Sequence, residues 1–137
     1  MNLTTKGRYG LAAMCELAQK TEDGPLSIAQ IANRLDLSPR YLEQIFRQLR
    51  AADLVHSSRG AKGGYSLSRE AGEITAGEIL EALEGKIVSV GCSGKQCAEQ
   101  CVDPQTCLTR PLWQKIQADV LGIVNTTTLE DLIEKEK

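Results

Sequence analysis

The sequence predicts a mainly α-helical fold with one small β-hairpin and a long helix near the C-terminus. Apolar residues recur every three or four positions over most of the chain, and a glycine-rich turn separates two short extended runs in its middle. The 137 residues are enough for one core with an appended arm. No apolar run reaches the ~20 residues needed to cross a bilayer, so we expect a cytoplasmic protein with reduced cysteines and no membrane partner.

Three helices are expected in the first fifty residues. Apolar residues recur at helical spacing from Thr5 to Lys20. Ser27 is a typical N-cap for a short second helix. After a tight connection at 35–37, Ser38 and Pro39 open the third helix as its N-cap and first residue. The third helix has an apolar stripe of Tyr41, Leu42, Ile45, Phe46 and Leu49 and a polar face of Arg40, Glu43, Gln44, Arg47, Gln48 and Arg50.

The rest of the chain predicts a hairpin, a fourth helix, a loop and two further helices. Extended runs at 54–58 and 65–68 flank a glycine-rich turn, and Thr75 caps a helix over Ala76–Leu83. Cys92–Cys107 lacks periodicity and reads as a loop. A long helix from Leu108 to about Val124 and a short one capped by Thr128 follow. The apolar stripe of the long helix is Leu112, Ile116, Val120 and Ile123. The expected division is a head over 1–84, a cysteine-rich loop over 85–107, and the last two helices over 108–137.

Helix, short helix, tight turn, helix and basic hairpin follow one another in the order of a winged helix-turn-helix. An exposed helix face fits the major groove of DNA. A glycine-rich hairpin tip can lie close to the DNA backbone while Arg59 and Lys62 meet phosphates or enter the minor groove. Residues 1–70 hold ten Lys or Arg and seven Asp or Glu, whereas residues 71–137 hold six and eleven. The more basic half is therefore the expected DNA-binding head.

Four cysteines lie close together in the loop, at positions 92, 97, 101 and 107. Thiols on one loop can converge on a metal, and thiolates favour zinc or an iron–sulfur cluster. The gaps are too even for two zinc knuckles and do not reproduce the common ferredoxin runs. Spacing alone therefore leaves a metal site or a redox site open.

Two other residues with reactive side chains are expected to be structural. Cys15 lies in an apolar helical pattern and is expected to be a small buried residue. His56 has no second histidine to share a metal and is expected at the surface or beside a phosphate. The sequence contains no hydrolase triad, phosphate loop or pair of catalytic carboxylates, so we do not expect an enzyme.

Four stretches of the chain resemble one family of winged-helix regulators. They are LTTKGRYGLAAM at 3–14, LSPRYLEQIFRQLRAADLV at 37–55, SSRGAKGGYSLSRE at 57–70 and ITAGEILEALEG at 74–85. They resemble the IscR family of iron–sulfur cluster regulators, which also includes the CymR-like regulators of cysteine metabolism. CymR-like members lack the cysteine cluster, so the cysteines followed by LTRPLW at 108–113 favour the IscR type.

The resemblance implies a [2Fe-2S] cluster bound by three loop cysteines and a histidine three residues after the last. Cys92 and Cys107 match the first and last of these cysteines, and the gap before Cys107 favours Cys101 over Cys97 as the middle one. Arg110 stands at the histidine position, and its guanidinium cannot ligate iron. Cys97 is then the expected fourth ligand, with Glu43 as the alternative.

The resemblance also implies how the head meets DNA. The expected DNA-binding residues are Ser38, Arg40, Tyr41, Glu43, Gln44, Arg59 and Lys62. Glu43 can accept from cytosine N4–H or act by rejecting other bases, and an intrahelical ion pair with Arg40 or Arg47 is the alternative role.

The function implied is that of a homodimeric transcription regulator whose long helices cross. Its two heads would read a palindromic operator about one helical turn (~34 Å) apart, and its cluster would report iron–sulfur status to control the genes of iron–sulfur assembly. Two alternatives remain open. One is a zinc- or thiol-dependent repressor of cysteine metabolism that acts with a partner protein. The other is a small iron–sulfur electron carrier.

Overall fold

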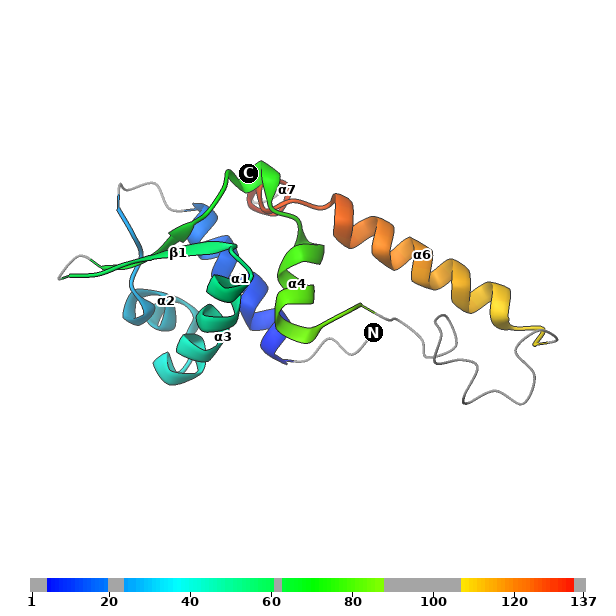
Figure 1. Ribbon diagram of the computed structural model, residues 1–137, viewed down its shortest axis with the longest axis horizontal. Helices are drawn as coiled ribbons and strands as arrows, with labels where there is room; N and C mark the ends of the chain where they lie inside the picture. Colours follow the sequence, from blue (N-terminus) through cyan, green and yellow to red (C-terminus); the bar gives the residue numbers. More distant parts are fainter. Residues whose placement is uncertain (1–4, 20–23, 61–62, 88–106, 135–137) are drawn as a thin grey trace.

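The computed structural model describes residues 5–19, 24–60, 63–87 and 107–134. In chain order its elements are α1 (Thr5–Gln19), α2 (Ile28–Leu35), α3 (Pro39–Ala51), β1 (Val55–Ser58), β2 (Gly64–Leu67), the 3₁₀ helix η1 (Ala71–Glu73), α4 (Ala76–Glu84), α6 (Arg110–Thr126) and α7 (Leu129–Glu134). Figure 1 shows the hairpin at one end of a helical head and α6 extending away from the other end. The predicted mainly α-helical fold with one small hairpin is confirmed.

Hydroxyl caps set the starts of the helices, as their sequences predict. Ser27 Oγ accepts from the Gln30 N–H, and the Gln30 side chain accepts from the Ser27 N–H, a capping box that begins α2. Ser38 caps α3 with Pro39 in its first turn. Thr75 and Glu78 form a capping box of the same kind at the start of α4. These caps fix the residue at which the exposed face of α3 begins.

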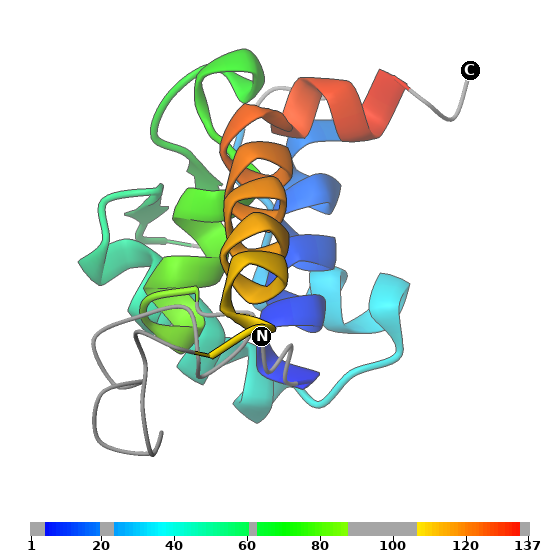
Figure 2. The same ribbon diagram turned by 90° about the vertical axis from the view of Figure 1, so that its right-hand side faces the viewer.

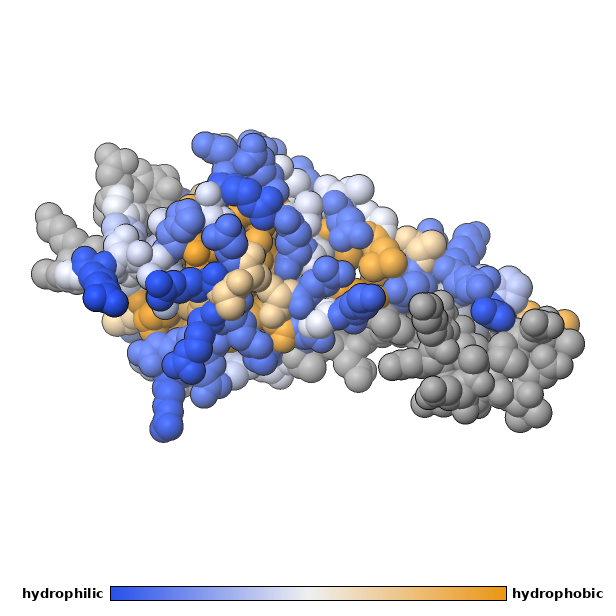
Figure 3. All heavy atoms as spheres, in the orientation of Figure 1, coloured by the Kyte–Doolittle hydropathy of each residue, from blue (hydrophilic) through white to orange (hydrophobic). Residues whose placement is uncertain are grey.

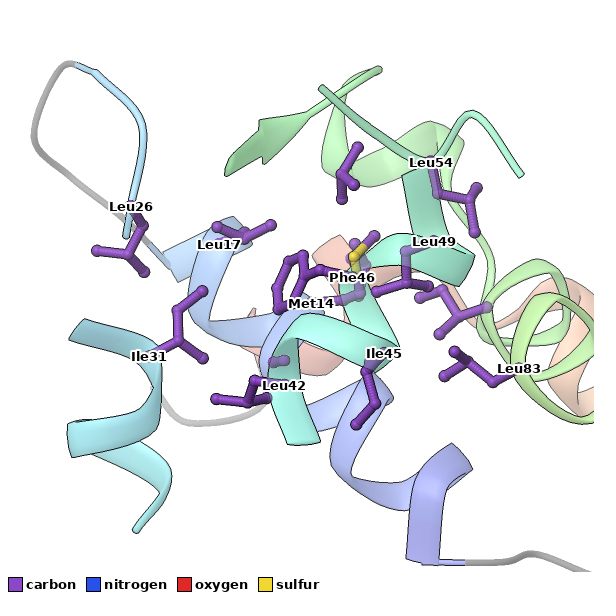
Figure 4. Close-up of a cluster of buried hydrophobic side chains, with 14 of the residues drawn as sticks. Met14, Leu17, Leu26, Ile31, Leu42, Ile45, Phe46, Leu49, Leu54 and Leu83 are labelled. Atoms are coloured by element: carbon purple, nitrogen blue, oxygen red, sulfur yellow. The ribbon is translucent and has the colours of Figure 1, made fainter. Parts of the chain in front are cut away.

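One apolar core joins the helices of the head to the hairpin. The buried face of α3 packs against Met14 and Leu17 of α1 (Figure 4). The Phe46 ring lies 4.7 Å from the Tyr65 ring of β2, measured between centroids. Tyr65 also exchanges two backbone hydrogen bonds with Leu26, of 2.9 and 2.8 Å. The hairpin is therefore held at a fixed angle to α3.

Two glycines of α1 allow α4 to pack directly against its backbone. A Cβ atom on Gly10 would lie 2.1 Å from Leu83 Cδ1, and one on Gly7 would lie 2.8 Å from the Glu84 carboxylate. Real Cβ atoms do not approach this closely, so a larger residue at Gly10 would displace the buried Leu83 side chain, whereas one at Gly7 would displace only the flexible end of the Glu84 side chain.

A backbone joint ties the end of α6 to the start of α4. The Ala76 N–H donates to the Thr127 carbonyl at 2.8 Å, and the Leu129 N–H donates to the Ile74 carbonyl at 3.0 Å. A Cβ atom on Gly77 would lie 2.2 Å from an Asn125 side-chain oxygen. We call these contacts the α4–α6 joint. Figure 2, which looks along α6, shows α7 crossing beyond the joint, where it packs against α1.

The structure departs from the sequence expectations in small ways. Helix α6 begins at Arg110 and ends at Thr126, two residues later at each end than the sequence predicts. At its end, the Thr126 and Thr127 hydroxyls donate to carbonyls of the preceding turn. The short helix η1 was not expected, and Cys15 is half-buried rather than buried. None of the helices in the described ranges is long and apolar enough to cross a membrane.

The close approach at Gly10 predicts a marked loss of stability on substitution. Gly10→Ala would force Leu83 out of its site, and overpacking of this kind costs about 1–3 kcal/mol. Urea unfolding followed by circular dichroism, at one protein concentration for all variants, measures the change.

Gly122→Ala in α6 is the matched control for Gly10→Ala. A Cβ atom at position 122 would meet nothing within 4 Å, so this change should leave stability unchanged or raise it by about 0.5–1 kcal/mol. Equal unfolding midpoints for the two alanine variants would contradict the close packing of α1 on α4.

Candidate nucleic-acid interface and cluster site

The outer face of α3 presents a stripe of polar side chains to solvent. Its exposed members are Arg40, Glu43, Gln44, Arg47 and Arg50, on the side opposite the buried stripe. Tyr41 is half-buried and packs edge-on against Tyr9, with 6.1 Å between ring centroids. Ser38 accepts the Tyr41 N–H through Oγ at 3.4 Å, so its side chain also holds the start of the helix. The residues predicted to read DNA on α3 therefore form one accessible surface, with Tyr41 at its edge.

A shallow hollow of about 300 Å³ connects this surface to the hairpin. It is lined by Ile28, Glu43, Arg47, Arg50 and Tyr65. The two ion pairs within the described ranges are Arg34–Glu16 and Arg69–Glu78, so the alternative role of Glu43, an intrahelical ion pair, is not formed. The Glu43 carboxylate and the two arginines are thus available to solvent or to a ligand in the hollow.

The hairpin forms an antiparallel wing whose tip is shaped by glycine. Val55 pairs with Leu67 and Ser58 with Gly64, and the Gly63 N–H closes the turn on the Gly60 carbonyl at 2.9 Å. Gly60 has φ 109°, a conformation that residues with a Cβ atom rarely adopt. Next to this turn, Arg59 is exposed, as is His56 on β1, whereas Lys62 lies outside the described residues.

Both ends of the cysteine-bearing segment lie close to α6. On the entering side, the Gln117 side chain donates to the Ile87 carbonyl at 2.6 Å. On the leaving side, Cys107 immediately precedes the first turn of α6. The other three cysteines of the cluster, at 92, 97 and 101, lie outside the described residues. Gln117 thus links the start of the segment to the helix that follows its end.

The Cys107 thiol lies in a small hydrogen-bonding network at the start of α6. Its Sγ is 3.3 Å from Thr109 Oγ1, which in turn accepts from Trp113 Nε1 at 3.1 Å. The Thr109 hydroxyl and backbone N–H lower the pKa of the Cys107 thiol, and the N–H and charge of Arg110 act in the same direction. This environment favours the thiolate, which is the form that binds metals.

The described residues at this end of α6 supply part of the ligand set that a thiolate-bound cluster needs. Cys107 supplies one thiolate, and Arg110 offers only hydrogen-bond donors. Within the ranges the structure describes, no group of three or more His, Cys, Asp or Glu could hold a metal ion. Figure 1 shows α3, which carries Glu43, and the Cys107 end of α6 at opposite ends of the molecule. The structure therefore does not bring Glu43 and Cys107 together within one chain.

Thr109, Trp113 and Gln117 were not singled out from the sequence. The first two are spaced four residues apart at a helix start, a spacing that places side chains on one face and could have suggested their contact. The contact of Gln117 with Ile87 spans the whole loop, and no local pattern indicates it.

Comparison with known proteins agrees with the winged-helix geometry. The family model Rrf2, described as "Iron-dependent Transcriptional regulator", matches residues 3–135. The HTH-type transcriptional regulator IscR of Cronobacter sakazakii is 39% identical over 137 residues, which cover 100% of this chain and 83% of IscR.

Two solved structures are also similar over nearly the whole chain. The global cysteine regulator CymR of B. subtilis has a TM-score of 0.86 and 43% identity, over 98% of each chain. The IscR of T. potens has a TM-score of 0.79 and 36% identity, over 100% of this chain and 89% of that one. The chain is therefore a winged-helix transcription regulator that belongs to the Rrf2 family.

Proposed function

We propose that this regulator is a homodimer that binds a palindromic DNA operator and senses iron–sulfur status through a [2Fe-2S] cluster held by the loop at 85–107. The observation that carries the proposal is the position of the cysteines: four lie within sixteen residues, and the last one lies three residues before the helix that is joined to the DNA-binding head. The regulated genes, by resemblance to the IscR type, are those of iron–sulfur assembly.

The polar stripe of α3 and the wing are the proposed DNA contacts. Arg40 and Gln44 lie near the start of α3 and can reach base edges in the major groove, while Ser38 and Tyr41 contact the DNA backbone beside them. Glu43 acts on specificity by accepting from cytosine or by rejecting other bases. Arg59 and Lys62 of the wing bind phosphates or the adjacent minor groove. DNA is in the cytoplasm of a bacterial cell, so we place the regulator there.

The exposed apolar side chains of α6 support the homodimer. Although α6 has 17 residues, none is buried. Leu112 and Ile123 of α6 are 52% and 64% exposed, and Leu108, just before the helix, is 96% exposed. Figure 3 shows apolar surface where α6 leaves the head and again at its far tip. We propose that the apolar stripe of α6 in a second copy covers these side chains. A two-fold crossing of the two α6 helices would bury the stripes of both copies at once.

The proposed cluster ligands are Cys92, Cys101 and Cys107, with Cys97 as the fourth. Four thiolates on one loop suit an iron–sulfur cluster, and Arg110 cannot replace the histidine of the resembling family. Glu43 would have to come from a different chain or after a large movement, because it lies at the far end of the molecule from Cys107.

When bound, the cluster supplies a compact charged centre that fixes the loop relative to α6. The protein's own residues then carry this constraint to the head. Gln117 holds the entering end of the loop on α6, and the α4–α6 joint fixes α6 relative to α4. Loading therefore shifts the population of head orientations that fit the operator.

A second function is favoured by the 43% identity and TM-score of 0.86 with CymR. In that case the regulator is a zinc- or thiol-dependent repressor of cysteine metabolism that works with a partner protein. Iron, sulfide and zinc analysis of anaerobically purified protein separates the two functions: iron with sulfide supports the cluster, and zinc or no metal supports the alternative.

Arg59→Ala tests the wing. It should weaken operator binding, because one phosphate or minor-groove contact is lost. The slope of log affinity against log salt concentration should become shallower by about one. Lys86→Ala removes the same charge from an exposed residue beyond the end of α4 away from the wing, and should bind normally. Equal affinities of the two variants, measured by fluorescence anisotropy over a salt series, would remove the wing from the interface.

Leu112→Glu tests the dimer. A charge within the proposed apolar crossing should dissociate the protein to a monomer in sedimentation velocity, because a carboxylate is costly to bury. Gln114→Glu makes the same charge on an exposed α6 position outside the stripe and should leave the dimer intact. A monomeric wild type, or a dimeric Leu112→Glu variant, would contradict the proposed crossing.

Single serine substitutions test the ligands. Cys107→Ser should abolish the visible absorption and the bound iron and sulfide, whereas Cys15→Ser should retain both, because Cys15 lies in the head helix α1. Cys97→Ser and Glu43→Gln then identify the fourth ligand: the variant that loses the visible absorption and the bound iron and sulfide is the one that lacks it. Retained iron and sulfide in Cys107→Ser would rule out the proposed ligand set.

A further inference from the structure

We propose that Thr109 is a positioning residue for the cluster, and that its hydroxyl donates a hydrogen bond to the Cys107 sulfur in a direction fixed by Trp113. The inference rests on the proposed function, since it assumes that Cys107 is a ligand. It gives a role to two residues, Thr109 and Trp113, that were not named as site residues from the sequence.

The direction of the hydrogen bonds follows from the donors available. An indole Nε1–H can only donate, so it occupies one lone pair of Thr109 Oγ1 at 3.1 Å. The hydroxyl has a single proton, and it is then free to point elsewhere. Cys107 Sγ lies 3.3 Å from the same oxygen, and a thiolate sulfur only accepts. The chain therefore runs from Trp113 through Thr109 to Cys107.

The start of α6 shows that the Thr109 hydroxyl is not needed by the helix. Thr109 occupies the N-cap position, where threonine usually accepts a backbone N–H from the first turn. Here it makes no such capping bond, and its backbone is in the αR region with φ −92° and ψ −10°. The equivalent hydroxyls at the starts of the other helices, those of Ser27, Ser38 and Thr75, all accept a capping hydrogen bond. The hydroxyl at position 109 is thus committed to the sulfur and the indole.

A hydrogen bond to a ligand sulfur changes the electronic properties of a cluster. It withdraws electron density from the thiolate and favours the more negative, reduced form. Thr109 should therefore raise the reduction potential, and Trp113 should contribute by holding the hydroxyl in place. Because Trp113 is the chain's single tryptophan, its indole N–H reports the same contact when no cluster is bound.

The test compares four variants in the full-length protein. Thr109→Val removes the hydroxyl, Thr109→Ser keeps it, and Trp113→Phe removes only the orienting donor. Thr126→Val is the matched control, since its hydroxyl donates to the Gly122 carbonyl at the other end of α6. Each protein is loaded with iron and sulfide anaerobically and titrated with dithionite under absorption. The indole N–H resonance is recorded separately in the unloaded protein by ¹H–¹⁵N NMR.

The expected result is a more negative potential for Thr109→Val, a smaller shift in the same direction for Trp113→Phe, and wild-type values for Thr109→Ser and Thr126→Val. The indole N–H should move upfield in Thr109→Val and return in Thr109→Ser. A loaded Thr109→Val with an unchanged potential would overturn the role of Thr109 and leave the proposed function standing. A wild type that binds no iron or sulfide would instead overturn the proposed function and with it this inference.

Discussion

The α4–α6 joint is the constraint on which the rest of the molecule depends. Two backbone hydrogen bonds pair the residues before α4 with those after α6, and the absence of a side chain at Gly77 lets Asn125 close against the helix. Backbone pairing of this kind allows little rotation, because both hydrogen bonds must be kept. The direction in which α6 leaves the head is set at this point, and in the proposed homodimer it would determine the separation of the two heads.

The joint also supplies a route by which the cluster proposed at the Cys107 end of α6 would act on the DNA-binding head. The cysteine-bearing segment is attached to α6 at Ile87 and at Cys107, and α6 is attached to the head through α4. α4 in turn packs on α1 without a gap, because Gly10 leaves room for Leu83. A displacement of the ends of this segment would therefore pass through close-packed contacts to the head, and side-chain rearrangement would absorb little of it.

Local signals explain what the sequence predicts well. Ser27, Ser38 and Thr75 each accept a nearby N–H, so the starts of α2, α3 and α4 follow from residues a few positions apart. The exposed stripe of α3 follows from helical periodicity for the same reason. The joint was not predicted, because it pairs segments that are distant in sequence. Thr109 was missed because the predicted helix begins at Leu108, which places this threonine inside the helix and not at its start.

The glycine-rich tip of the wing has a consequence for how it can meet a duplex. Two paired strands have axes ~4.8 Å apart, and with the thickness of the backbone itself they are wider than a minor groove of ~6 Å. In the proposed complex the hairpin would lie on the sugar–phosphate backbones, where the lack of side chains at Gly60, Gly63 and Gly64 allows a close approach. Only an extended side chain is thin enough to pass between those backbones. In the proposed DNA complex, the backbone of the wing would therefore set the depth to which the Arg59 side chain reaches.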